Sequence, residues 1–175
     1  QCVDLGRSLL RVFAVTLDAD PQFFSGSFDF TISRGSTLFY PPQPPELGDR
    51  QFGVAPHTDY GCLTLLYQDG TGGLQVLGAD GNWINASPLK GTFVVNVGDL
   101  LARWTNDRFR STPHRVVNSS GRARQSLAVF VDPNFSTPIV PVVAGAEAAK
   151  YSPTTCGAHI LSRFDKSFAY RPGRS

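Results

Sequence analysis

The feature that most constrains the fold is a regular alternation of short apolar runs and turn-forming residues between Ser36 and Asp132. Short strands at steady spacing are typical of an antiparallel sandwich or barrel, and a double-sheet jelly roll has about eight strands. We therefore expect a mainly β fold whose jelly-roll core, a double-stranded β-helix, covers about residues 36–132. Besides a strand whose end carries His57 and Asp59, the expected strands are Ser36–Tyr40, Cys62–Tyr67, Leu74–Leu77, Trp83–Ala86, Thr92–Val97, Arg110–Val117 and Ser126–Val131.

Helices are expected on both sides of this core. Apolar residues recur at near-helical spacing in the first segment, at Leu5, Leu9, Val12 and Phe13. The tail, residues 152–170, is amphipathic around Ile160 and predicts a C-terminal helix. A chain of 175 residues is the size of one domain, so residues 1–175 are interpreted as a single domain. The chain begins with Gln and contains no Met, so we expect it to lack an N-terminal part.

Composition narrows the class of protein. The formal net charge is only +2 and the Arg residues are scattered, so neither a nucleic-acid-binding stripe nor a membrane-binding helix is indicated. No apolar run is long enough to span a bilayer. Three widely spaced cysteines, Cys2, Cys62 and Cys156, fit free thiols in a reducing compartment, so we expect a cytoplasmic location. We further expect a monomer.

The sequence His57-Thr58-Asp59, together with the later His114, suggests a metal site with open positions. Residues two apart on a strand point to the same face, so His57 and Asp59 can both face inward at a strand end. Two imidazoles and one carboxylate on one face of a metal suit Fe(II), because the other face can take a co-substrate and dioxygen. His57, Asp59 and His114 are therefore the candidate iron ligands.

Arg124 and Ser126 suggest a clamp for an anionic co-substrate. They are two residues apart in an expected strand and so face the same way. A guanidinium group gives a carboxylate two parallel charge-assisted hydrogen bonds, and a hydroxyl adds a third. An inward-facing Arg also implies an anionic partner, since a buried cation without one costs several kcal/mol.

The chain resembles the 2-oxoglutarate and Fe(II)-dependent dioxygenases of the isopenicillin-N-synthase-like group. Each motif alone is weak, but together and in this order they are specific, and the resemblance covers nearly the whole chain. The motifs that carry it are Leu38-Phe39-Tyr40-Pro41-Pro42, His57-Thr58-Asp59, Gly73-Leu74-Gln75-Val76, Asn96-Val97-Gly98-Asp99, His114-Arg115-Val116, Arg124-Gln125-Ser126 and the tail 161–168.

The resemblance implies a role for individual residues. His57, Asp59 and His114 would ligate Fe(II), and O₂ would react there. Arg124 and Ser126 would bind the distal carboxylate of 2-oxoglutarate, and Tyr40 would hydrogen-bond the same co-substrate. Leu38 stands where the family motif often has Asn, which removes one polar contact. Phe135 is a candidate substrate contact because it follows the last strand.

The activity implied is oxidative decarboxylation of 2-oxoglutarate coupled to hydroxylation or desaturation of a small organic substrate. Three alternatives stay open: an isopenicillin-N-synthase-like oxidase that does not use 2-oxoglutarate, a catalytically inactive jelly-roll binding domain, and a cupin-type metal enzyme. Arg-x-Ser occurs in the synthase itself, so this motif alone does not establish the co-substrate. His159 is interpreted as a surface residue without a role. The residues expected in the barrel core are Thr64, Leu66, Phe93, Val95 and Phe130.

Overall fold

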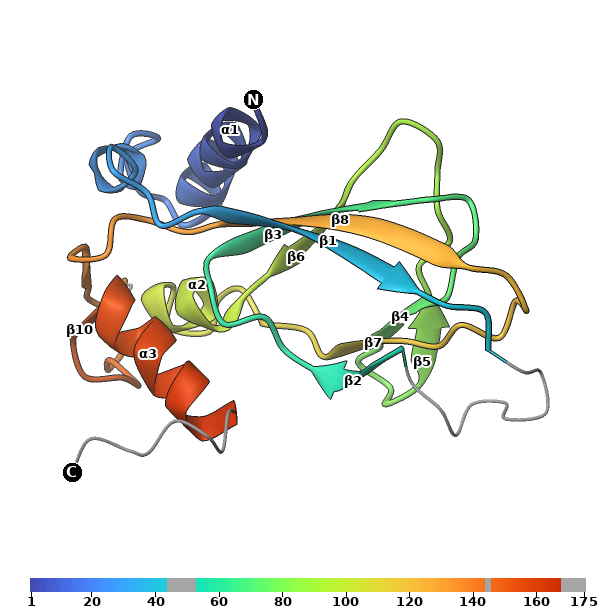
Figure 1. The fold of residues 1–175 in the computed structure, drawn as a ribbon. Helices are drawn as coiled ribbons and strands as arrows, with labels where there is room; N and C mark the ends of the chain where they lie inside the picture. Colours follow the sequence, from blue (N-terminus) through green and yellow to red (C-terminus); the bar gives the residue numbers. More distant parts are fainter. Residues whose placement is uncertain (44–52, 144–145, 168–175) are drawn as a thin grey trace.

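Eight antiparallel strands in two four-stranded sheets form the body of the protein (Figure 1). The structure is a computed structural model and describes residues 1–43, 53–143 and 146–167. The major sheet has the order β1-β8-β3-β6 and the minor sheet the order β2-β7-β4-β5. The bounds are β1 Arg34–Tyr40, β2 Val54–His57, β3 Leu63–Gln68, β4 Leu74–Leu77, β5 Trp83–Asn85, β6 Val94–Val97, β7 His114–Val116 and β8 Arg124–Val131. The expected jelly roll is confirmed.

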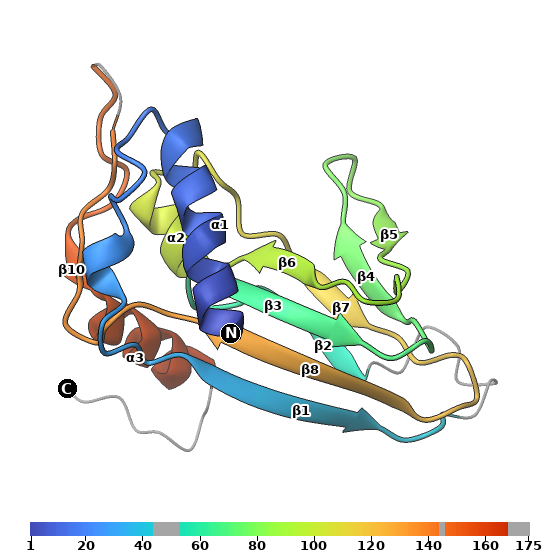
Figure 2. The ribbon, with the colours of Figure 1, turned by 90° about the horizontal axis from the view of Figure 1, so that it is seen from above.

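The helices gather around one end of the two sheets, as Figures 1 and 2 show. They are α1 Cys2–Thr16, the short 3-10 helix η1 Ser25–Ser27, α2 Asp99–Trp104 and α3 Cys156–Ser167, beside a small pair of strands, β9 Pro138–Ile139 and β10 Thr154–Thr155. Both expected flanking helices are present, although the part of the tail beyond 167 lies outside the described residues. Across the described ranges, no helix is long and apolar enough to cross a membrane.

The face of α1 that packs on the domain agrees only in part with the one predicted, since Leu9 and Phe13 pack against the core but Leu5 and Val12 do not. Gly6, Leu10 and Ala14 are buried, whereas Leu5 is 41% and Val12 62% exposed. A Cβ atom at Gly6 would lie 2.7 Å from a methyl group of Val131 on β8. The helix therefore lies so close to the major sheet that glycine is the residue that fits at this contact.

Two apolar clusters flank the region between the sheets. The larger one joins the helices to the major sheet, and the smaller one consists of Tyr40, Leu74 and Val116. Polar side chains that include Arg124 and Ser126 are buried beside the smaller cluster. The fold thus leaves room for a polar site between two sheets whose other contacts are mainly apolar.

The predicted barrel core is only partly correct. Thr64 is buried, and Leu66 and Phe130 are partly buried and line the cavity between the sheets. Phe93, however, is 36% and Val95 42% exposed. Val95 lies on β6 and Phe93 directly precedes this strand. In the described part of the chain β6 is the edge strand of the major sheet and pairs with β3 alone, so its side chains have fewer neighbours.

Most strand predictions are right in position and wrong by a few residues at their ends. The strand expected over Thr92–Val97 begins at Val94, and the one expected over Arg110–Val117 is only His114–Val116. All three cysteines are free, and burial raises the pKa of Cys62 well above its usual value and that of Cys156 to about 12. These two thiols are therefore packing groups rather than nucleophiles.

Candidate metal centre

His57, Asp59 and His114 meet at one point between the sheets. One ligand atom from each lies within 4.8 Å of the other two. Nε2 of His57 is 3.9 Å and Nε2 of His114 3.8 Å from Oδ1 of Asp59. Asp59 and His114 are buried, while the His57 side chain is 38% exposed. Two imidazole nitrogens and one carboxylate oxygen on one side of an open space are a donor set that fits Fe(II).

Strand pairing explains how residues 57 positions apart come together. His57 is the last residue of β2 and His114 the first of β7, and they are direct partners in the antiparallel pair. Asp59 lies just beyond the end of β2, in the turn that leads to β3. The backbone N–H of Asp99, at the start of α2, donates a hydrogen bond of 2.7 Å to the carbonyl of Asp59. The ligand-bearing turn is thus held by the helix behind it.

Each histidine is oriented by its other ring nitrogen. Nδ1 of His57 lies 2.8 Å from the carbonyl oxygen of Ala55, and Nδ1 of His114 lies 3.1 Å from that of Thr112. A carbonyl accepts only, so Nδ1 carries the proton and Nε2 presents its lone pair to the centre. Burial lowers the pKa of His114, which favours the neutral ring that a metal requires.

Asn96 is a member of the site that sequence reasoning did not single out. Its Nδ2 donates a hydrogen bond of 2.5 Å to Oδ2 of Asp59, which leaves Oδ1 directed toward the histidines. Asn96 lies on β6, which pairs with β3, and its side chain contacts Asp59 in the turn that precedes β3. Its place in the motif Asn96-Val97-Gly98-Asp99 was the available signal.

A second network ties the ligand-bearing turn to the C-terminal helix. Thr58 donates a hydrogen bond of 3.2 Å to Asp99, and Oδ2 of Asp99 lies 2.7 Å from Nη2 of Arg163 on α3. Nε2 of His159 lies 3.0 Å from the carbonyl oxygen of Tyr60. The interpretation of His159 as a surface residue without a role is therefore wrong: its ring is half-buried, burial lowers its pKa, and its neutral form donates to the turn.

Arg124 is fully buried on β8 next to Ser126. Its Nε donates to the carbonyl of Gly72 (2.6 Å), its Nη2 to Gln68 (3.0 Å) and its Nη1 to the Ser126 hydroxyl (3.3 Å). Within the described ranges it takes part in none of the ion pairs. Its hydrogen-bond partners are all neutral. Backbone hydrogen bonds and the nearby charge of Arg124 lower the pKa of Asp69, but the two residues form no ion pair. A buried guanidinium without an ion pair is costly unless an anion completes its surroundings.

Register places Tyr40 and Leu38 beside this guanidinium. Tyr40 is the partner of Arg124 in the β1–β8 pair, and Leu38 is the partner of Ser126. The Tyr40 ring is buried, and its centre lies 4.7 Å from the guanidinium carbon of Arg124. All four side chains line one cavity of about 100 Å³, whose lining also includes His57, Asp59, His114 and Asn96.

Phe135 is not brought to this cavity. It is 52% exposed, and its ring lies against Gly157 near the start of α3, where it leaves no room for a Cβ atom. It is not among the residues that line the cavity between the sheets. Its role as a substrate contact stays a prediction.

Comparison with known proteins agrees with this geometry. The model of the 2OG-Fe(II) oxygenase superfamily matches residues 30–133, which is more than half of the chain. The chain therefore belongs to the 2OG-Fe(II) oxygenase superfamily, which is named for its use of Fe(II) and 2-oxoglutarate.

Individual relatives are similar over almost the whole chain. The 2-oxoglutarate-Fe(II) type oxidoreductase hxnY of Emericella nidulans is 38% identical over 170 residues, covering 94% of this chain and 49% of the relative. A homoarginine-6-hydroxylase of Oryza sativa subsp. japonica is 38% identical over 175 residues, covering 94% of this chain and 53% of the relative. A full-length Neurospora crassa protein crystallised with alpha-KG and thymine has a TM-score of 0.90 and 35% identity, covering 96% of this chain and 54% of that one. The chain thus spans about half the length of these relatives.

Proposed function

We propose that this chain carries the iron- and 2-oxoglutarate-binding core of an oxygenase that hydroxylates or desaturates a small organic molecule. The donor set of His57, Asp59 and His114 supports the iron site. Arg124, Ser126 and Tyr40 support the co-substrate site. The single observation that carries the proposal is that both groups line the same cavity between the two sheets.

The candidate iron ligands and the co-substrate residues both line this cavity and have different roles in it. His57, Asp59 and His114 would hold Fe(II), which supplies the activation of O₂ when it and 2-oxoglutarate are bound. Arg124 would receive the distal carboxylate with the donors it turns toward the cavity, and Ser126 would add a hydroxyl hydrogen bond. Because Arg124 is fully buried, this contact would be shielded from water and correspondingly strong.

Tyr40 would form one wall of the co-substrate site, next to Arg124. Its ring covers the guanidinium face, and its hydroxyl is the group that the resemblance assigns to 2-oxoglutarate. Leu38 and Phe130 would supply apolar walls that exclude water from the reacting groups.

Relatives named as 2-oxoglutarate-Fe(II) oxidoreductases and a similar structure with bound alpha-KG favour use of 2-oxoglutarate over an oxidase reaction that does without it, and the buried Arg124 is suited to its carboxylate. The complete donor set likewise disfavours an inactive binding domain, since loss of a ligand would be the mark of such a domain.

The proposal also covers the substrate class, the oligomeric state and the compartment. Relatives named as a homoarginine hydroxylase and a protein crystallised with thymine support a small polar organic molecule, with Phe135 as a contact from the α3 side. We infer one domain over residues 1–175, active as a monomer, and the three free thiols support a reducing compartment such as the cytoplasm. Residues outside this chain would complete the substrate pocket if an N-terminal part belongs to the protein.

Succinate formation tests the proposed reaction. The purified chain is incubated with Fe(II), 2-oxoglutarate and O₂, without a substrate, and succinate is quantified against His114→Ala. We expect slow uncoupled formation of succinate in the parent chain and none in the variant. Equal succinate formation by both proteins would contradict the proposed iron site. Iron binding without succinate, with 2-oxoglutarate recovered intact, would instead support the oxidase alternative.

A further inference from the structure

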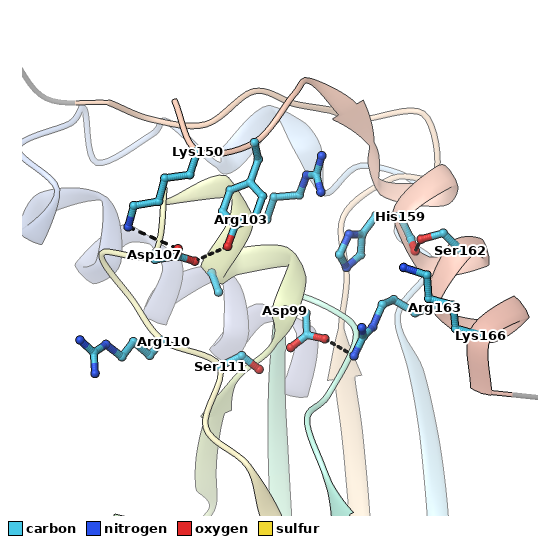
Figure 3. Close-up of a pocket in the computed structure, with 12 residues that line it drawn as sticks. Asp99, Arg103, Asp107, Arg110, Ser111, Lys150, His159, Ser162, Arg163 and Lys166 are labelled. Carbon is cyan, nitrogen blue, oxygen red and sulfur yellow. Dashed lines mark hydrogen bonds and ion pairs between the residues drawn. The ribbon is translucent and has the colours of Figure 1, made fainter. Parts of the chain in front are cut away.

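A cleft away from the metal centre lies between α2 and α3 (Figure 3). Its volume is about 610 Å³, which is within the usual range for sites that bind small molecules. It shares no lining residue with the cavity that contains His57, Asp59 and His114. Neither the iron site nor the co-substrate clamp accounts for it.

The walls of this cleft are strongly cationic. Five cationic side chains line it: Arg103, Arg110, Lys150, Arg163 and Lys166. They face only two carboxylates, and both are already engaged. Asp99 is paired with Arg163 at 2.7 Å, and Asp107 is paired with Lys150 at 3.3 Å.

The remaining cations have no acidic partner among the described residues. Arg103 donates to the carbonyl of Ser152 (2.7 Å) and lies over the ring of Tyr151, both of which are neutral. Lys166 extends its ammonium group from α3 toward α2, and Arg110 lies at the outer rim, as Figure 3 shows. Three positive charges therefore line the cleft without an acidic partner among the described residues, and such a concave positive site attracts anions.

Buried polar atoms without partners collect at the same place. In the described ranges four buried side-chain N or O atoms have no hydrogen-bond partner, and three of them belong to residues of this cleft: Arg103 Nε, Ser111 Oγ and Arg163 Nε. A buried donor or acceptor without a partner is destabilising. The cleft wall is thus not satisfied by the protein itself, and a small shift of these side chains toward a ligand would give them acceptors.

We propose that the cleft between α2 and α3 binds a small polyanion that carries phosphate groups or several carboxylates. Arg103, Arg163 and Lys166 are the principal contacts, and Arg110 contributes from the rim. The ion pair of Asp99 uses Nη2 of Arg163, so a ligand can engage the rest of that guanidinium without breaking the pair. The site goes beyond the proposed oxygenase function and does not depend on it.

Calorimetric titration of the metal-free chain with pyrophosphate, and separately with citrate, tests this proposal. The test variant is Arg110→Ala/Lys166→Ala, which removes two exposed charges that have no described partner. The matched control is Arg7→Ala/Lys90→Ala, which removes the same charge from exposed positions on other parts of the surface. Circular dichroism shows whether each variant is folded.

We expect saturable binding of at least one of the two anions by the parent chain, weakened about tenfold in the test variant and unchanged in the control. Tighter binding of pyrophosphate would assign the site to phosphate-bearing ligands, and tighter binding of citrate to polycarboxylates. Absence of binding by the parent chain would overturn the proposal. So would equal affinity in parent and test variant, because that result would place the anion elsewhere, for instance at Arg124.

Discussion

Tyr40 and Arg124 are direct partners across β1 and β8, and the guanidinium carbon of Arg124 lies 4.7 Å from the centre of the Tyr40 ring. The pair joins a cation, an aromatic face and a hydroxyl in one wall of the cavity between the sheets. The guanidinium is fully buried, so the ring is part of what keeps the cation in place.

Two substitutions of Tyr40 distinguish the contribution of its ring from that of its hydroxyl. Tyr40→Phe keeps the ring over Arg124 and removes the hydroxyl, so we expect 2-oxoglutarate to bind about 2–10-fold more weakly. Tyr40→Ala removes both and should also lower the free energy of unfolding by about 3 kcal/mol, since a buried aromatic ring is lost. Titration of the iron-loaded protein and denaturant unfolding measure the two effects. The control is Phe39→Ala, because Phe39 is 63% exposed on the opposite face of β1. Unchanged affinity in Tyr40→Phe would remove the hydroxyl from the co-substrate site.

Asn96 orients the carboxylate of Asp59 without itself being a candidate ligand. Asn96→Ala should therefore weaken Fe(II) binding about 10–100-fold, as is usual for the loss of a hydrogen bond to a metal ligand. Anaerobic Fe(II) titration measures this, with Asn85→Ala on the exposed strand β5 as the control. If Asn96→Ala binds iron as tightly as the parent chain, the orienting role is wrong.

The ligand-bearing turn is connected to α3 through Thr58, Asp99 and Arg163. Substitutions within this connection should therefore weaken Fe(II) binding through the same loss. We expect Asp99→Asn and Arg163→Gln each to weaken Fe(II) binding about 3–10-fold, and the double variant to be no worse than either single one. The reason is that both substitutions break the same 2.7 Å ion pair. Lys166→Gln, on the same helix, is the control. Additive losses would show that the two residues act independently.

Burial lowers the pKa values of both His114 and His159 below the usual value for histidine. The unfolded chain then binds more protons than the folded one just below about pH 6.5. The free energy of unfolding that these two histidines contribute is therefore present above that pH and decreases as the pH falls below it. Denaturant unfolding of the metal-free chain at several pH values measures this loss. His114→Gln/His159→Gln should show a flatter profile, while contributions from Asp132 are common to both proteins. Parallel profiles would contradict the assignment.

Local alternation was enough to predict the positions of Arg124 and Ser126, because residues two apart on a strand share a face whatever the strand pairs with. It could not identify Asn96 or Gln68, which contact the site across strands that are far apart in sequence. Pairing of distant strands is decided by the tertiary fold, so a single sequence carries little signal for it.

The errors in the predicted core have a similar origin. Leu5 and Val12 are larger and more apolar than Gly6 and Ala14, yet the small residues face the sheet because α1 approaches β8 too closely for large ones. On β6 and just before it, Val94, Val95 and Phe93 are all apolar, so periodicity gives no indication of which side faces water. Among the described residues β6 is at the edge of its sheet and has a strand neighbour on one side only, which leaves these side chains more open to water.

The most direct test of the central claim is an anaerobic spectrum. Fe(II) and then 2-oxoglutarate are added to the purified chain, and the visible charge-transfer band of the iron chelate is recorded for the parent, His114→Ala and Arg124→Ala proteins. The account predicts a band in the parent chain, no band in His114→Ala, and a weaker band at equal 2-oxoglutarate in Arg124→Ala. A parent chain that binds iron but gives no band with 2-oxoglutarate would contradict the shared cavity as a site for both.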